Sequence, residues 1–223
     1  IESFLSKNKA FKNLSGFTEL NAFVSSLEQP RKIWLMIKSG PAIDGLLEEL
    51  TPLLSAGDII VDGGNSHYPD TQRRAQELQK KKIDFVGCGV SGGEVGARNG
   101  ASIMFGGSTD AYTQFRPILN KIAAKDKSNV PCQSYMGKEG AGHFVKMVHN
   151  GIEYAEMQLL AETFAVLANQ MSYPEIVAVF QEMNQDSEAS YLLEITAEIL
   201  QKKEGNRFLV DLILDQASSK GTG

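Results

Sequence analysis

The sequence contains little cysteine, no surplus of basic residues and no long hydrophobic run. Its cysteines are Cys88 and Cys132, and no C-x-x-C pair occurs. A disulfide framework or a structural zinc site is therefore not expected, and a reducing cytoplasm is the expected location. The 27 acidic and 22 basic residues give a net charge of −5, which argues against a nucleic-acid partner bound by bulk charge. No apolar stretch approaches the ~18 residues of a membrane span and the first residues do not resemble a signal peptide, so we expect no membrane partner.

What remains is an ordinary globular composition in a chain of 223 residues, with 42% hydrophobic and 22% charged residues. This length exceeds a single domain of roughly 100–200 residues, so we expect one domain plus a second piece. The first residue is Ile1 rather than methionine, which suggests that the chain has been cut from a longer polypeptide.

The first 137 residues alternate between short apolar runs and helix-like stretches. Strands are expected at 32–37, 58–62, 83–87, 102–107 and 133–137, and helices at 16–27, 41–54, 69–81 and 110–124. Near-continuous apolar strands favour a parallel sheet covered by helices on both faces. We therefore predict a partial doubly wound α/β domain over residues 1–137, in which no strand, glycine loop and helix precede Ser39.

From Gly140 onward the apolar spacing is helical. A long helix is predicted from Gly140 to about Gln170, because no strong turn signal interrupts it, and further helices are predicted at 174–185, 188–203 and 208–217. The expected fold class is therefore α/β followed by all-α, with residues 138–223 as the start of a helical domain that opens with the long helix.

Two glycine-rich motifs follow predicted strands. G-C-G-V-S-G at 87–92 matches the dinucleotide fingerprint G-x-G-x-x-G, but that fingerprint must open a helix, and Gly93, Gly96 and Gly100 interrupt any helix here. We interpret the motif instead as a glycine-rich active-site loop or as tight turns. G-K-E-G-A-G at 137–142 opens the long helix, where it fits either a phosphate cradle or close packing of the helix on the sheet.

One face of the long helix carries several different functional groups. With Lys146 at 0° and about 100° per residue, the polar residues of this face, His149, Asn150, Glu153 and Tyr154, fall between about 300° and 80°. The apolar residues fall between about 180° and 260° and are expected to form the core face; they are Val145, Val148, Ile152, Ala155 and Leu159. The polar stripe indicates either a functional face, where burial tunes an amine as a base and a carboxyl as an acid, or an ordinary solvated face.

Four stretches, in this order, resemble the decarboxylating 6-phosphogluconate dehydrogenases over essentially the whole chain. They are IIVDGGNSHYPDT at 59–71, VGCGVSGGEVGARNGASIM at 86–104, GAGHFVKMVHNGIEYAEMQL at 140–159 and KGTG at 220–223. The wider β-hydroxyacid dehydrogenase group shares the S-G-G loop and a Lys followed four residues later by Asn. The runs H-N-G-I-E-Y and K-G-T point to the 6-phosphogluconate branch of that group.

The resemblance implies a Rossmann-like cofactor domain followed by a helical substrate and dimerisation domain. The implied activity is metal-free, NADP-dependent oxidation of 6-phosphogluconate at C3, followed by loss of carbon dioxide to give ribulose 5-phosphate in the pentose phosphate pathway. The full-length protein is then expected to be a homodimer.

The resemblance also assigns roles to individual residues. Lys146 resembles the base that takes the C3 hydroxyl proton and later returns a proton to the C3 oxygen, and Glu153 resembles the acid that protonates C1 of the enediol. Among the remaining matches, contacts to the substrate hydroxyls and carboxylate are implied for His149, Asn150, Ser91, Gly92 and Gly93, and contacts to the substrate phosphate for Tyr154 and Lys220. Asn65 matches a residue that contacts both substrate and cofactor. The loop under the cofactor is matched by Ile37, Lys38 and Ser39.

The resemblance is incomplete at both ends of the chain. The family's first strand, its glycine phosphate loop and the Arg that recognises the 2′-phosphate have no counterpart before Ser39, and the chain stops within the helical domain. We therefore expect this chain alone to be inactive. Two alternatives stay open: another β-hydroxyacid dehydrogenase, against which Tyr154 and Lys220 argue, and a non-catalytic remnant that binds sugar phosphate or pairs with full-length subunits.

Overall fold

The computed structural model describes residues 1–185, 189–214 and 216, which form two compact units. The first unit covers Ile1–Met147 and the second starts at Val148. The long helix α7, Ala141–Leu167, begins in the first unit and continues into the second.

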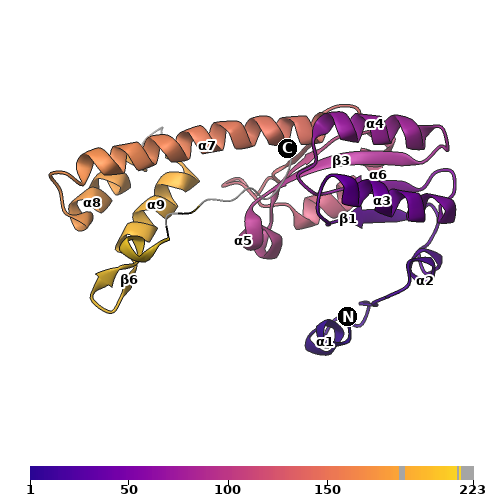
Figure 1. Ribbon diagram of the computed structural model, residues 1–223, viewed down its shortest axis with the longest axis horizontal. Helices are drawn as coiled ribbons and strands as arrows, with labels where there is room; N and C mark the ends of the chain where they lie inside the picture. Colours follow the sequence, from indigo (N-terminus) through magenta and orange to yellow (C-terminus); the bar gives the residue numbers. More distant parts are fainter. Residues whose placement is uncertain (186–188, 215, 217–223) are drawn as a thin grey trace. The chain divides into compact units, whose positions relative to one another are not determined.

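The first unit is built on a five-stranded sheet in the order β1-β2-β3-β4-β5 (Figure 1). Its strands are β1 (Lys32–Leu35), β2 (Ile59–Asp62), β3 (Asp84–Ser91), β4 (Ser102–Phe105) and β5 (Gln133–Tyr135). β1, β2 and β3 are parallel with Ile33 opposite Ile60 and Ile60 opposite Phe85, which confirms the expected doubly wound core. The carboxyl ends of these three strands therefore meet at one edge of the sheet, where ligands bind in open α/β sheets.

Helices cover both faces of this sheet, as predicted. On one face of the sheet, α6 (Thr109–Ile122) buries Phe115 and Leu119. They pack against Val86 and Cys88 of β3. On the other face α3 (Pro41–Leu50) and α4 (Tyr68–Gln79) enclose Ile60 and Phe85. Since side chains alternate along a strand, Phe85, Gly87 and Gly89 share the α4 face, which is the face on which α7 begins.

The fourth strand departs from the expected parallel sheet. β4 runs antiparallel to β3, with Cys88 opposite Phe105, and β5 is again parallel to β4. Few residues separate Ser91 from Ser102, whereas a parallel crossover needs roughly a dozen residues or more. The link holds the short helix α5 (Gly93–Asn99), so the expectation that its glycines would prevent any helix was wrong. Gly92 at its amino end has φ 143° and accepts the Gly96 amide, which closes the first turn.

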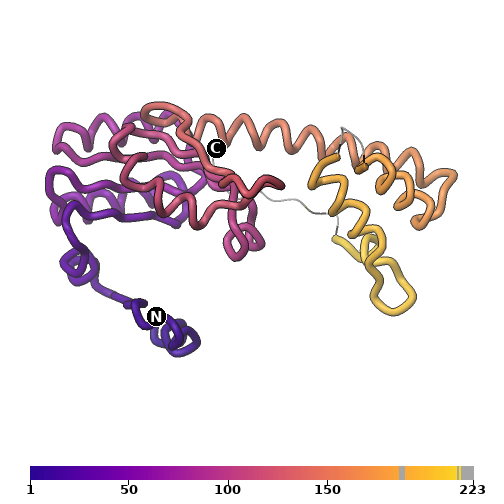
Figure 2. The backbone as a smooth tube through the Cα atoms, turned by 180° about the vertical axis from the view of Figure 1, so that it is seen from behind, coloured from indigo at the N-terminus to yellow at the C-terminus, as the bar shows by residue number. Residues whose placement is uncertain are grey.

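The amino-terminal residues contribute little to the core. α1 (Glu2–Lys7) buries no residue, and both views show it standing clear of the sheet (Figures 1 and 2). Phe4 and Phe11 are 61% and 67% exposed. α2 (Leu20–Ser25) is shorter than the predicted helix at 16–27, but Val24 is buried and ties it to the α3 and α4 face of the sheet.

The second unit packs α7 against α8 (Tyr173–Met183) and α9 (Tyr191–Gln201) around Ile176, Phe180 and Leu200. This confirms the predicted helical domain, to which β6 (Lys203–Glu204) and β7 (Arg207–Phe208) add a short hairpin. Gly205, with φ 60°, starts its two-residue turn, a position that favours glycine. The helix predicted at 208–217 was wrong for the described residues, because they hold this strand and the 3-10 turn Leu209–Leu212.

The structure reverses the expected orientation of α7. Lys146 is 7% exposed, whereas Val148 and Ile152 from the expected core face are 43% and 65% exposed. Farther along, Leu160, Phe164 and Leu167 pack into the core of the second unit, and helical geometry places these three at about 300–360°, on the same side as Lys146. The assignment of the 180–260° face to the core was therefore wrong for the described part of the chain.

A buried carboxylate joins the amino ends of β1 and β2. Asp58 Oδ1 accepts the Arg31 amide at 2.7 Å, and Oδ2 accepts the Arg31 guanidinium and the Ser55 amide, both at 2.9 Å. Burial raises the pKa of Asp58, but the Ser55 and Arg31 hydrogen bonds outweigh burial and bring the pKa below its ordinary value. The charged form is therefore the one that the folded state stabilises.

Replacing Asp58 with asparagine should lower the free energy of unfolding by about 3 kcal/mol at pH 7, since it leaves the Arg31 guanidinium without its buried partner. Because the folded pKa is depressed, the contribution of Asp58 is present above the unfolded value of ~3.9 and is lost as the pH falls below it. The difference between wild type and D58N should therefore shrink below pH ~4. Urea unfolding of wild type and D58N, at pH 7 and below pH ~4, measures this difference in the free energy of unfolding.

Asp70→Asn is the matched control, because Asp70 is half-exposed and lies 3.9 Å from Arg73. An exposed ion pair of this kind contributes about 0–1 kcal/mol. Equal losses in D58N and D70N would contradict the assignment of a buried clamp at Asp58.

Candidate active site

Two loops follow the parallel strands β1 and β2 at the carboxyl edge of the sheet. Gly63 donates its amide to the Leu35 carbonyl at 3.0 Å, so the two loops leave the sheet side by side. The buried Asp62 carboxylate accepts the Gly64 amide at 3.0 Å and the Ser66 hydroxyl at 2.6 Å. These bonds close the turn that carries the half-buried Asn65.

The loop after β1 carries the predicted cofactor contacts. Ile37 is 39% exposed, Lys38 is exposed and Ser39 is buried. Gly40 has φ 89°, a backbone conformation that favours glycine, and its carbonyl accepts from Arg74 at 3.0 Å. An apolar side chain beside a rigidly held backbone at the carboxyl edge of a parallel sheet fits one side of a dinucleotide site.

α7 approaches β3 more closely than side chains on the strand would allow. A Cβ on Gly89 would lie 2.5 Å from the Cβ of Lys146 and 2.9 Å from the Gly142 carbonyl. A Cβ on Gly87 would lie 2.7 Å from His143 Nδ1. Gly87, Gly89 and Gly142 therefore serve close packing of the helix on the sheet, which was one of the two interpretations offered for G-K-E-G-A-G.

The same contact places Lys146. Its side chain is 7% exposed and packs on Gly89, two residues before Ser91 ends β3. Gly92 and Gly93, both exposed and both with positive φ, then lead into α5. A buried lysine thus packs on the strand that runs directly into the S-G-G loop.

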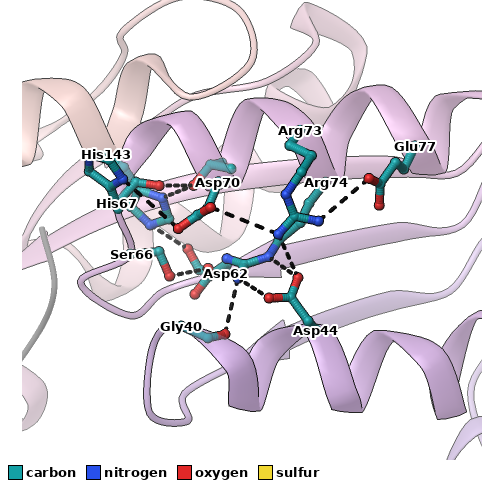
Figure 3. Close-up of polar contacts among 11 residues, drawn as sticks. Gly40, Asp44, Asp62, Ser66, His67, Asp70, Arg73, Arg74, Glu77 and His143 are labelled. Atoms are coloured by element: carbon teal, nitrogen blue, oxygen red, sulfur yellow. Dashed lines mark hydrogen bonds and ion pairs between the residues drawn. The ribbon is translucent and has the colours of Figure 1, made fainter.

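The first turn of α7 is anchored by a histidine that was not among the predicted site residues. His143 is 2% exposed, and its Nδ1 lies 2.8 Å from the Thr71 hydroxyl. Its Nε2 lies 3.1 Å from the backbone carbonyl of Asp62 (Figure 3). Burial holds the pKa of His143 below its ordinary value, so the ring is neutral. A carbonyl only accepts, so Nε2 donates to Asp62 and Nδ1 accepts from Thr71. All three residues lie within the motifs that carried the resemblance, but a buried histidine gives no sequence signal of its own.

A second group of predicted residues lies on the part of α7 that belongs to the second unit. His149 Nδ1 is 3.2 Å from the Asn150 amide oxygen and 3.8 Å from Glu153 Oε2. The side chains of His149 and Glu153 are 35% and 36% exposed, and Tyr154 is 64% exposed. A carboxyl, an imidazole and an amide are therefore gathered where solvent and a ligand can reach them.

The structure thus brings the predicted residues together in three groups. Lys146 lies against β3 ahead of Ser91, Gly92 and Gly93; Asn65 sits in a turn beside the loop Ile37–Ser39; and His149, Asn150 and Glu153 contact one another on α7. Lys220 lies outside the described residues. Among the described residues, no group of three or more His, Cys, Asp or Glu side chains could hold a metal ion, and no helix is long and apolar enough to cross a bilayer.

Family sequence models match nearly the whole chain. The NAD binding domain of 6-phosphogluconate dehydrogenase matches residues 2–137, and the 6-phosphogluconate dehydrogenase C-terminal domain matches residues 142–223. The chain belongs to the 6-phosphogluconate dehydrogenase family. The G-C-G-V-S-G motif accordingly lies inside the cofactor-domain match without being the fingerprint of that domain, since β4 returns antiparallel and no βαβ unit follows it.

Curated relatives extend well beyond this chain. It is 53% identical over 216 residues to the NAD(+)-dependent, decarboxylating 6-phosphogluconate dehydrogenase of Bacillus subtilis, covering 95% of this chain and 46% of the relative. It is 50% identical over 226 residues to the decarboxylating enzyme of Schizosaccharomyces pombe, covering 100% of this chain and 46% of the relative. The chain therefore spans slightly less than half the length of the curated relatives it matches.

Solved structures agree with this assignment. The Plasmodium falciparum 6-phosphogluconate dehydrogenase, described in its apo form and in complex with its cofactor NADP+ and its substrate 6-phosphogluconate, matches with a TM-score of 0.90 and 41% identity, covering 99% of this chain and 48% of that one. A 3-hydroxyisobutyrate dehydrogenase from Salmonella typhimurium matches with a TM-score of 0.60 and 20% identity, covering 75% of this chain and 56% of that one. The second match shows a shared fold only.

Proposed function

We propose that the protein containing this chain oxidises 6-phosphogluconate at C3 and decarboxylates it to ribulose 5-phosphate, and that this chain supplies its catalytic helix. The observation that carries the proposal is the burial of Lys146 beside Gly89, on the strand that leads into the S-G-G loop. Lysine is rarely buried in a folded protein, and titratable groups with perturbed surroundings gather at functional sites. Family membership supplies the substrate class.

In this proposal Lys146 moves a proton at one oxygen in both steps. Its Nζ takes the proton of the C3 hydroxyl while the C3 hydride departs, and the C3 oxygen becomes a ketone. During loss of the C1 carboxylate, the same ammonium returns a proton to the C3 oxygen, which gives the neutral enediol. One reversible group therefore serves both steps.

Glu153 then acts on a different atom. Its carboxyl donates a proton to the enediol carbon left by the departing carbon dioxide, which forms the ketose product. The neighbouring His149 and Asn150 side chains offer an imidazole and an amide to the substrate hydroxyls and carboxylate, with Ser91, Gly92 and Gly93 as the proposed second wall. Tyr154 and Lys220 are the proposed phosphate contacts.

The chain carries only part of the proposed cofactor site. Ile37, Lys38, Ser39 and Asn65 fit one edge of a nicotinamide dinucleotide, which accepts the hydride when bound. We propose NADP, because the solved Plasmodium falciparum relative is described with NADP+; the Bacillus subtilis relative is named as NAD(+)-dependent. The ratio of kcat/KM for NADP and NAD in the full-length protein tests this choice.

The full-length protein should reduce NADP on addition of 6-phosphogluconate and release carbon dioxide, with a chelator having no effect. The isolated 223-residue chain should show little or no turnover, since a glycine loop at a helix amino terminus normally binds the pyrophosphate and none precedes Ser39. Absorbance of reduced cofactor, with and without the substrate, measures both.

Three outcomes would count against this account. Robust turnover by the isolated chain would contradict the role given to the missing loop. Loss of turnover on chelation would contradict the metal-free mechanism. Preference for 3-hydroxyisobutyrate over 6-phosphogluconate would favour another β-hydroxyacid dehydrogenase.

The exposed side of α7 supports a homodimer in the full-length protein. Val148, Ile152, Leu159 and Val166 are 43–71% exposed, and helical geometry puts all four between about 200° and 240° on one apolar stripe. Apolar stripes of this length mark surfaces that another element covers. We expect sedimentation of the full-length protein to give a stable dimer, and a stable, active monomer would contradict this.

We propose a cytoplasmic location because both cysteines are free thiols. Cys88 is buried and Cys132 half-buried. Burial raises the pKa of the Cys88 thiol, so it is held in its unreactive protonated form. Free thiols fit a reducing compartment.

A further inference from the structure

His143 links three elements of the first unit at one buried point. Its ring contacts Thr71 on α4 and the Asp62 carbonyl at the end of β2, while its backbone belongs to the first turn of α7. Thr71 and Asp62 are both fully buried, and His143 is 2% exposed. No solvent competes for these hydrogen bonds, so each constrains the position of α7 strongly.

Thr71 lies on α4, and buried contacts of Arg74 fix this helix against α3 and the loop before it. Arg74, one turn along α4 and 1% exposed, holds Asp44 of α3 through Nε at 2.8 Å and Nη2 at 2.9 Å, and it also donates to the Gly40 carbonyl. Figure 3 shows this guanidinium and the His143 ring on the same side of α4. The Arg74 and Arg73 hydrogen bonds hold the pKa of Asp44 well below its usual range, so the pair stays charged. α4 therefore cannot shift easily beneath Thr71.

The Asp62 side of the link stands on the turn that carries Asn65. The Asp62 carboxylate accepts from Gly64 and Ser66, while its backbone carbonyl accepts from His143. One residue thus closes the predicted substrate and cofactor turn and also holds α7. A movement of this turn would therefore displace the His143 ring through its hydrogen bond to the Asp62 carbonyl.

Lys146 follows His143 by three residues and faces the same strand. Glycine contacts at Gly87 and Gly89 set how closely α7 approaches β3, because any Cβ there would collide with His143 or Lys146. Because glycine has no side chain, these contacts do not by themselves determine the position of α7 along β3. The two directional bonds of His143 do determine it.

We propose that His143 is a positioning residue for the proton-transfer step, which fixes Lys146 relative to the Asn65 turn through the Thr71–His143–Asp62 bridge. The inference rests on the proposed function of Lys146. It does not require His143 to touch substrate or to change its protonation state.

The test uses Thr71→Val and Thr71→Ser in the full-length protein. T71V keeps the shape of the buried side chain and removes the donor to His143 Nδ1, whereas T71S keeps the donor. Because a displacement of about 1 Å can cost roughly 100-fold in rate, T71V should lower kcat roughly 10-fold to 100-fold. The KM for 6-phosphogluconate should change little, and the primary deuterium isotope effect at C3 should increase. T71S should restore most of kcat, and Thr113→Val, an exposed threonine on α6, is the matched control.

A second variant covers the case in which T71V does not fold. His143→Gln has one planar amide and can keep only one of the two bridge contacts at a time. It should give the same kcat loss with the KM conserved, and in the double variant with T71V the two losses should not add.

The proposal is overturned if folded T71V and H143Q both retain wild-type kcat, or if T71S loses as much as T71V. Failure of the proposed function looks different: the wild-type full-length protein would not oxidise 6-phosphogluconate at all. In that case, reductive methylation of Lys146 in this chain, quantified by peptide mass spectrometry, still tests the bridge. Lys146 should react several-fold faster in T71V than in T71S, and equal rates would refute the positioning role.

Discussion

Replacing Lys146 with methionine in the full-length protein should reduce turnover by about 10³–10⁴-fold, the high end for a general acid–base group. Methionine keeps the unbranched, buried stem against Gly89 and removes the amine, so the C3 hydroxyl has no group to take its proton. Hydride transfer itself is therefore blocked. Stopped-flow absorbance should show no burst of reduced cofactor in the first turnover.

Lys121→Met is the control for this substitution, because Lys121 is exposed in the last turn of α6. Its kcat should equal that of the wild type. Near-wild-type turnover in K146M would mean that Lys146 only fills the space between α7 and β3, and it would remove the central claim about this site.

Replacing Glu153 with glutamine should also slow turnover severely, by about 10²–10⁴-fold, but at a later step. Oxidation at C3 does not need the proton that Glu153 gives to the enediol carbon, so the first hydride transfer should proceed, while protonation of that carbon cannot. E153Q should therefore show a single-turnover burst of reduced cofactor followed by very slow cycling. The absence of a burst in K146M and its presence in E153Q separate the two proton-transfer roles.

Glu162→Gln is the matched control on the same helix, where the carboxylate accepts a hydrogen bond from Gln158 at an exposed position. A surface change of this kind usually alters stability by no more than about 0.5 kcal/mol, and no rate change is expected. If E153Q turned over as fast as E162Q, Glu153 would belong to a solvated helix face and not to the site.

Most strands and helices, and the family, could be predicted from the sequence because they depend on local signals. Apolar runs such as 58–62 and 83–87 are dense in β-branched and aromatic residues, and the helices between them carry charged outer faces, so strand and helix follow from period and composition. Long motifs such as G-H-F-V-K-M-V-H-N leave little ambiguity about the family. The roles proposed for Lys146 and Glu153 followed from that family.

The orientation of α7 could not be predicted in this way. By composition, the stripe containing Val148 and Ile152 is the better core face, yet the side that carries Lys146 is the one that packs in the described residues. The reason is a long-range one: Gly87 and Gly89 on β3 lie opposite Gly142 and leave room for a helix to come close, and only the folded sheet brings them together.

The direction of β4 and the bridge through His143 likewise depend on tertiary structure. The short link through α5 permits a turn back but no crossover, so β4 pairs antiparallel. His143 lies 72 residues from Thr71 and 81 from Asp62 along the chain, and hydrogen bonds over such separations have no periodic signature. Local chemistry in this sequence thus determined most of the elements and the family to which they belong, while close packing between distant segments decided which side chains are buried together at the site.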